Sequence, residues 1–372
     1  MSVMIFFYLL AGLLLLVAGA EVLVRGAAKL AAQFNIPPLI IGLTVVAFGT
    51  SAPETAVSVQ AAMNGSGDLA IGNVLGSNIA NVLMVLGLTA LVAPLIVSRQ
   101  LIRLDVPIMI GASLVVYALA WDGSLSRMDG ALLVAGILAY TSFLIISSRK
   151  APTIDNDEFS KEFGLQEAPK PYAWLADLGL ILAGLLLLVG GAQLLVEGAV
   201  SLARALGLSE LIIGLTVVAV GTSLPELATS ILAAFKGERD IAVGNIVGSN
   251  IFNLLLVLGL ASLLAPLPIS VSPNALAFDF PVMIAVAVAC LPIFFAGYSI
   301  NRWEGLLFVA YYGAYILYLA LFATGRPFAQ TFGDAMLGYV VPLTAVTLLV
   351  IAGRAWQTER QACGKSGPTG PL

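Results

Sequence analysis

Apolar residues fill most of the chain in continuous runs of about 20 residues, the length that an α-helix needs to cross the hydrocarbon core of a bilayer. The runs do not alternate between apolar and polar positions, which favours helices over the strands of a membrane barrel. The pattern predicts eleven membrane helices, at 4–28, 38–63, 70–93, 101–121, 128–148, 173–200, 210–235, 242–265, 275–297, 302–323 and 334–353.

The chain repeats itself. Residues 41–94 and 213–266 match at 34 of 54 positions without a gap, at a constant offset of 172. Five predicted helices precede the polar stretch 151–172, so the second copy enters the membrane from the opposite side. We therefore expect an all-α polytopic membrane protein of two inverted five-helix repeats with an extra C-terminal helix. Its parts are a first half (1–150), an acidic linker (151–172), a second half (173–323), and an accessory helix with a polar tail (324–372).

Composition agrees with this class, because the mean hydropathy is +1.02 and only 10% of the residues are charged. With the N-terminus outside, 14 of the 17 Lys and Arg residues fall on the cytoplasmic side, as the positive-inside rule requires. The linker is then cytoplasmic, and we interpret it as a solvated connection. A net charge of -4 and the absence of histidine argue against nucleic-acid binding and against histidine-based metal or nucleophile chemistry.

Each copy places one glutamate inside an apolar stretch, Glu54 in the first and Glu226 in the second. A carboxylate at membrane depth is costly and commonly marks an ion or proton pathway. Thr50 and Ser51 precede Glu54 by four and three residues, so all three side chains share one helix face. The same spacing recurs in the second copy, in Thr222, Ser223 and Glu226.

A proline directly precedes each glutamate, and it is expected to bend the helix. Pro53 and Pro225 lack an N–H group, which frees the carbonyl four residues earlier, at Gly49 and Gly221. Broken helices at membrane depth are tolerated where the backbone lines a cavity or binds an ion. Carboxylate, hydroxyl and carbonyl oxygens together suit a hard cation such as calcium or sodium.

In each copy a second predicted helix with polar residues follows shortly after the glutamate. Ser77 and Asn81 lie on one helix face, as do Ser249 and Asn253. In each copy, two glycines spaced four residues apart are expected to let this helix approach the glutamate-bearing helix closely. They are Gly72 and Gly76 in the first copy, and Gly244 and Gly248 in the second. Two further amides, Asn73 and Asn245, are interpreted as helix-packing groups. Glu21 has Gln193 at the equivalent position, so it is left out of the predicted site.

The two motifs, Gly-Thr-Ser-x-Pro-Glu and Gly-Ser-Asn-Ile-x-Asn, each occur twice, within 42–81 and 214–253. They resemble the alpha-repeats of the cation/calcium exchanger superfamily, most closely its prokaryotic sodium/calcium exchanger branch. The resemblance implies ten helices in two inverted halves of an inner-membrane protein that exchanges Ca²⁺ for Na⁺, without an enzymatic activity or a cofactor. It also implies that Glu54 and Glu226 ligate both ions. The sodium sites would be completed by Thr50, Ser51, Thr222, Ser223, Ser77 and Ser249, with the carbonyls of Ala47 and Ala219.

One departure from that resemblance concerns the amides that join the two glutamates, Asn81 and Asn253. Some relatives carry an aspartate where this chain has Asn253, so the predicted site holds two carboxylates and two amides. Two negative charges match one calcium ion but compensate three sodium ions less well. Calcium/proton exchange and potassium-dependent exchange stay open as alternatives, whereas a passive channel or an intramembrane hydrolase fits the doubled motif less well. Membrane lipid is the expected surroundings, and the sequence carries no signal for an oligomeric state.

Overall fold

The computed structural model of the protein describes residues 3–34, 36–148, 173–206, 219–295 and 297–323, with the single positions 333 and 353. Within these ranges, eight helices are long and apolar enough to cross a membrane, and a ninth span is bent by 46°. These nine coincide with nine of the eleven predicted helices. The helix expected at 210–235 is described only from residue 219, and the linker and the C-terminal helix lie outside the described residues.

The helices follow one another in the same order in both halves. The first half contains α1 (Val3–Gln33), α2 (Pro38–Ile41), η1 (Gly42–Val46), α3 (Ala47–Thr50), α4 (Ala52–Met63), α5 (Gly67–Ala80), η2 (Asn81–Leu86), α6 (Gly87–Val92), η3 (Leu101–Asp105), α7 (Val106–Leu119), η4 (Ala120–Asp122) and α8 (Arg127–Ser148). The second half contains α10 (Ala173–Ala205), α12 (Ala219–Gly221), α13 (Leu224–Phe235), α14 (Arg239–Phe252), η6 (Asn253–Val257), α15 (Leu258–Leu264), η7 (Ala275–Asp279), α16 (Phe280–Phe295) and α17 (Arg302–Ala323).

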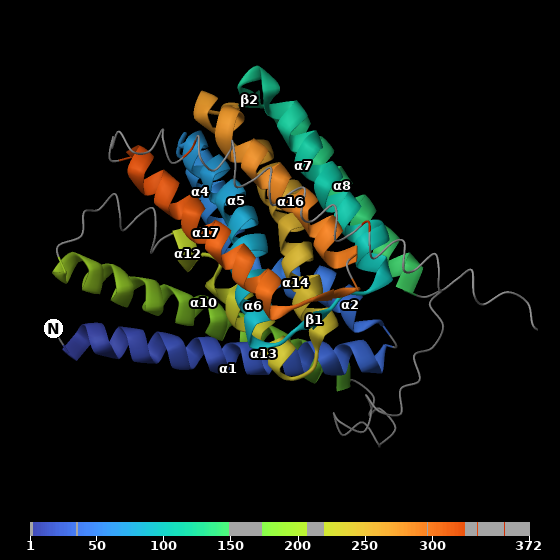
Figure 1. Ribbon diagram of the computed structural model, residues 1–372. Helices are drawn as coiled ribbons and strands as arrows, with labels where there is room; N and C mark the ends of the chain where they lie inside the picture. Colours follow the sequence, from blue (N-terminus) through green and yellow to red (C-terminus); the bar gives the residue numbers. More distant parts are fainter. Residues whose placement is uncertain are drawn as a thin grey trace, which may run out of the picture.

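The first long helices of the two halves, α1 and α10, lie side by side across one face of the remaining helices (Figure 1). Glycines let their backbones touch. A Cβ added to Gly12 would lie 2.9 Å from the carbonyl oxygen of Gly191, and one added to Gly19 would lie 2.9 Å from that of Gly184. Because Gly12 corresponds to Gly184 and Gly19 to Gly191 at the repeat offset, the two contacts are equivalent under exchange of the halves.

Two continuous helices form the centre of the molecule, namely α5 with η2 and α6, and α14 with η6 and α15. In each, 83% of the most apolar stretch is buried within the protein, against 11–39% for the other six unbroken spans among the described residues. The second of these helices holds fifteen consecutive buried residues at Ile241–Leu255. A helix that is apolar all round and buried all round is a core element, so the second motif of each copy lies at the core.

Short antiparallel strand pairs tie each half to the other. Strand β1 (Leu95–Ile96) pairs with β4 (Ser299–Ile300), and β2 (Ser124–Leu125) pairs with β3 (Ile269–Ser270). The helices show the same exchange, since α6 packs on α17 and α15 packs on α8. The halves are thus interlocked rather than two separate domains. The inverted orientation of the two repeats across the membrane stays a prediction.

The predicted helix breaks are present, but two residues later than expected. The kink falls at Ser51, with φ -81° and ψ 7°, and at Ser223, with φ -87° and ψ 6°. Pro53 and Pro225 each occupy the first turn of the helix that follows. Proline is favoured there because the first N–H groups of a helix have no partner within it, so the proline starts a new helix instead of kinking one through its middle.

The glycine contact between α1 and α10 predicts the effect of a single methyl group. Gly191→Ala places a Cβ 2.7 Å from the backbone nitrogen of Leu16, so the helices must separate. We expect a loss of roughly 1–3 kcal/mol in stability, measured as a lower thermal unfolding midpoint in detergent. Gly190→Ala is the matched control, because its added Cβ has no neighbour within 4 Å. Equal midpoints for the two variants would contradict the close packing.

Candidate ion-binding site

The helix breaks bring the hydroxyl and carboxyl groups of each first motif to one place. Thr50 ends α3, Ser51 forms the kink, and Glu54 lies in the first turn of α4. In the second half, Ser223 forms the kink and Glu226 lies in the first turn of α13. Both glutamates are fully buried, with 0% of their surface exposed. Negative side chains in a first helical turn are favoured by the helix dipole, which lowers the cost of this burial.

Side chains from the two halves meet at these breaks. The Ser51 hydroxyl donates to Glu226 Oε1 at 3.4 Å, and the hydroxyl oxygens of Thr50 and Ser249 lie 3.3 Å apart. The carboxyl groups of Glu54 and Glu226 are close enough for their charges to interact. The first motifs of both copies and the second motif of the second copy therefore contribute to one buried polar cluster at the centre of the protein.

Most buried side-chain oxygen and nitrogen atoms without a hydrogen-bond partner, within the described residues, belong to the predicted site. Buried polar atoms in folded proteins are almost always paired with protein groups or with water. Uncompensated oxygens beside two carboxylates form a set that a hard cation could complete. The unpaired oxygens are both carboxylate oxygens of Glu54, Glu226 Oε2, the hydroxyls of Ser77 and Ser223, and the side-chain carbonyls of Asn81 and Asn253.

The remaining predicted ligands are less completely placed. The Ala47 carbonyl, at the start of α3, accepts the Ser51 N–H at 3.0 Å and the Thr50 hydroxyl at 3.4 Å. Thr222 is half-buried, and Ala219 opens α12 at the edge of the described residues. Among those residues, no cluster of three or more acidic, histidine or cysteine side chains occurs. A bound cation would thus be held by two carboxylates and by neutral oxygens.

Close helix approach, predicted from glycines in both copies, is formed in the second copy. A Cβ added to Gly244 would lie 2.8 Å from the Leu39 carbonyl oxygen, and one added to Gly248 would lie 2.7 Å from the Ala47 Cβ. Helix α14 therefore packs directly on the broken helix of the other half. Their counterparts Gly72 and Gly76 have no such neighbour among the described residues, and Gly72 is exposed.

Two serines that the sequence analysis missed support the site. Ser58 accepts a hydrogen bond from the Asn73 amide at 2.9 Å, and Ser230 accepts one from the Asn245 amide at 3.0 Å. The two asparagines therefore do pack helices together, as predicted. Both serines follow their glutamate by four residues and recur at the repeat offset. That shared spacing on the glutamate face was the signal that could have identified them.

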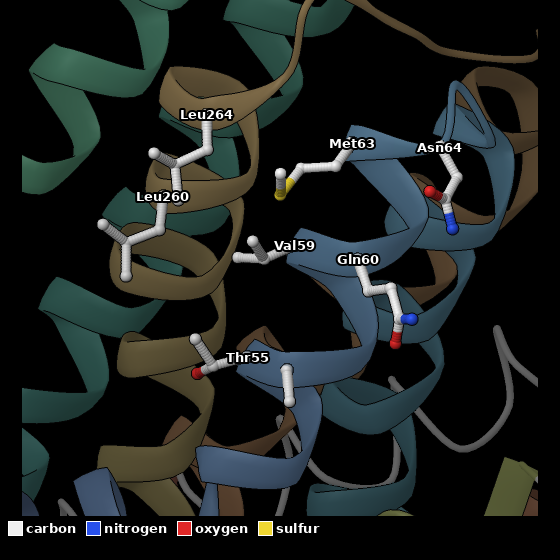
Figure 2. Close-up of a pocket in the computed structure, with 8 residues that line it drawn as sticks. Thr55, Val59, Gln60, Met63, Asn64, Leu260 and Leu264 are labelled. Atoms are coloured by element: carbon white, nitrogen blue, oxygen red, sulfur yellow. The ribbon is translucent and has the colours of Figure 1, made fainter.

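An open groove of about 520 Å³ lies between α4 and α15 and begins beside the site (Figure 2). It starts at Thr55, the residue after Glu54, and ends at Asn64, where α4 terminates. Figure 2 shows Val59 and Met63 of α4 pointing toward Leu260 and Leu264 of α15. The opposite half is covered, since α1 packs along α13, whereas α10 makes no comparable contact with α4.

Known proteins share this architecture. Residues 4–146 and 177–321 match the model of the family described as "Sodium/calcium exchanger protein". The chain is 43% identical to the "Putative antiporter CaxA" of Alkalimonas amylolytica, over 76% of this chain and 88% of that one. It is 33% identical to the "Sodium/calcium exchanger MaX1" of Methanosarcina acetivorans, over 84% and 98%. A solved structure of the sodium-calcium exchanger NCX_Mj matches with a TM-score of 0.71 and 30% identity, over 88% of this chain and 100% of that one.

The unpaired side-chain amides of Asn81 and Asn253 are predicted to lower the stability of the ion-free protein. Replacing Asn81 or Asn253 by the similarly sized leucine removes two buried atoms that lack partners. In ion-free buffer we expect each variant to unfold at a higher temperature, by the equivalent of about 1–2 kcal/mol. Asn73→Leu is the matched control, and it should lower the midpoint because it breaks the bond to Ser58. Loss of stability in the Asn81 and Asn253 variants would show that these amides have partners in the folded protein.

Proposed function

The chain belongs to the sodium/calcium exchanger family, and from this membership and the site geometry we propose that it is a secondary active antiporter exchanging Ca²⁺ for Na⁺. The observation that carries the proposal is the set of buried oxygens without partners around Glu54 and Glu226. Such a set has the ligand chemistry of a calcium or sodium site. Both ions are substrates that pass through the protein, and neither is a resident cofactor.

Competition for two carboxylates couples the fluxes. One Ca²⁺ neutralises Glu54 and Glu226, and Na⁺ ions compete for the same oxygens, so the two substrates bind alternately. An unneutralised pair of buried charges is costly to carry between two packed arrangements. The loaded site therefore changes its exposure readily, whereas the empty site does so only rarely, and this difference in rate converts binding competition into exchange.

Alternating access follows from the two halves. The groove along α4 leads toward one side of the buried site, and the packing of α1 on α13 covers the corresponding helix of the other half. In the orientation with the N-terminus outside, α4 runs outward, so the groove opens to the exterior of the prokaryotic inner membrane and the linker 151–172 is cytoplasmic. Movement of the α1–α10 pair against the remaining helices would close this groove and open its counterpart.

Calcium/proton exchange is the second candidate, favoured by one specific observation. Asn253 contributes an amide where a third carboxylate would help to compensate several sodium ions. A buried carboxylate can instead carry a proton, so two glutamates suffice to exchange one Ca²⁺ for two protons. The relatives named CaxA and the inner membrane protein YrbG of Escherichia coli, which is 42% identical, have names that specify no counter-ion.

The counter-ion is tested in proteoliposomes that contain the purified protein. Uptake of calcium-45 is measured under an imposed sodium gradient, proton gradient or potassium gradient in separate experiments. We expect the sodium gradient to drive uptake. Uptake driven by the proton gradient alone would replace sodium by protons in the proposal. Equilibration of calcium without any imposed gradient, at the same rate in all conditions, would indicate a channel and contradict exchange.

The carboxylates are tested one at a time. Glu54→Gln and Glu226→Gln each remove one of the two charges that hold the ion, and we expect either change to reduce calcium flux at least a hundredfold. Glu304→Gln is the matched control. Glu304 is also buried, but it accepts the Asn301 N–H at 2.7 Å at the start of α17, and a glutamine oxygen can replace that acceptor. Retained flux in the Glu54 or Glu226 variant would refute the assignment.

A further inference from the structure

Each copy contains one asparagine that fastens the second motif to the glutamate-bearing helix. The Asn73 amide donates to Ser58 at 2.9 Å and to the Glu54 carbonyl at 3.4 Å. The Asn245 amide donates to Ser230 at 3.0 Å and to the Glu226 carbonyl at 3.5 Å. The two sets of bonds agree to within 0.1 Å, so each half holds its asparagine in the same orientation, with the side-chain carbonyl oxygen turned away from the serine.

The side-chain carbonyl oxygen of this asparagine accepts a hydrogen bond from a threonine of the site in only one of the two copies. Thr50 donates its hydroxyl to Asn245 Oδ1 at 3.0 Å, across the boundary between the halves. Thr222 and Asn73, the equivalent residues, form no such bond with each other, and both are only half-buried. Thr50 and Asn245 are fully buried, with 0% exposure. One hydroxyl of the site is therefore fixed by the opposite half, and its counterpart is not.

The bond fixes the role of the Thr50 oxygen. A threonine hydroxyl has one hydrogen to donate and two lone pairs to offer. An asparagine oxygen has no hydrogen, so Thr50 must use its own hydrogen in this bond, which is shorter than its 3.4 Å contact with the Ala47 carbonyl. The Ser249 hydroxyl, 3.3 Å away, can then donate to one lone pair of Thr50 Oγ1, and the other lone pair stays available to a cation. Because the Asn245 amide is held by Ser230 and the Glu226 backbone, the second half orients a hydroxyl that belongs to the first.

The helices packed around Thr50 and around Thr222 also differ between the two halves. Thr50 reaches Asn245 because α3 packs on α14, where Gly248 admits the Ala47 Cβ. On the other side, α4 borders the open groove with Gln60 exposed. Leu232, which corresponds to Gln60, is partly buried on the covered helix α13. The bonded threonine therefore belongs to the covered side, and the unbonded one to the open side.

We propose that Asn245 and Asn73 are alternating acceptors, which take the hydroxyl of Thr50 in this arrangement and that of Thr222 in the opposite one. The exchange rests on the alternating access of the proposed function. Since the halves repeat the same residues, the opposite arrangement is this one with the halves interchanged. Asn245 then stabilises the present arrangement and Asn73 the opposite one, although their chemistry within each half is the same. Both are positioning residues, because each orients a hydroxyl group of the site.

The two roles predict effects of opposite sign, which labelling can measure. Gln60→Cys and Leu232→Cys are introduced separately after Cys290 and Cys363 are replaced by alanine. The rate of modification by a polar, membrane-impermeant maleimide is then measured on purified protein in choline buffer without calcium or sodium. Asn245→Ala should slow labelling at position 60 and speed it at position 232, by about fivefold, the population change expected for one hydrogen bond. Asn73→Ala should change both rates in the opposite directions.

Equal shifts of the same sign in the two asparagine variants, or no shift in either, would overturn the proposal, because a purely structural role affects both copies alike. Thr50→Val and Thr222→Val form a second pair that removes only the hydroxyl and keeps the volume, and it decides the matter if an alanine variant fails to fold. These rates are measured without transported ions. A protein that labels as expected but does not exchange calcium would fail the proposed function and not this inference.

Discussion

Two carboxylates buried in one polar cluster within an apolar core are the constraint on which the rest of this structure depends. Removing such groups from water costs several kcal/mol each, and like charges add to that cost. The protein gives Glu54 and Glu226 little compensation of its own, because three of their four carboxylate oxygens have no hydrogen-bond partner. Placement in the first turn of α4 and of α13 offsets part of the penalty. The part of the penalty that is not offset makes the site bind cations strongly. A cluster whose polar atoms were all paired within the protein would attract cations less.

Close approach of helices is what allows the two carboxylates to share one site. The broken helix of the first half packs on α14 through Gly244 and Gly248, where any larger residue would collide with the backbone of Leu39 or with Ala47. The α1–α10 pair uses glycine in the same way. Small residues at such interfaces replace the hydrophobic effect, which is weak between helices in a lipid environment. They also leave backbone surfaces that can separate without exposing large side chains.

The repeat made much of this predictable from the sequence. The spacing of Thr50, Ser51 and Glu54, doubled at an offset of 172, placed three oxygens on one face, and all three are buried in the cluster. The position of the kink was wrong by two residues, because a proline is better accommodated at a helix start than within it. The hydrogen bond from Thr50 to Asn245 could not be predicted from the sequence, because it joins residues 195 apart through the packing of one half on the other. A repeat also predicts equal halves, and therefore cannot say which copy is covered.

One ion pair occurs in a single copy and so makes the two halves unequal. Glu21 of α1 accepts hydrogen bonds from Arg25 and from Lys236 at the end of α13, and so ties α1 to the helix that it covers. The residues equivalent to Glu21 and Lys236 are Gln193 and Asn64, so the interchanged arrangement cannot form this pair. Both side chains are partly exposed, and such a pair contributes about 0.2–1 kcal/mol. Between two arrangements that otherwise repeat the same contacts, that difference alone changes their ratio by up to about fivefold. The repeat supplies two nearly equal states, and the few positions where it fails decide which one prevails at rest.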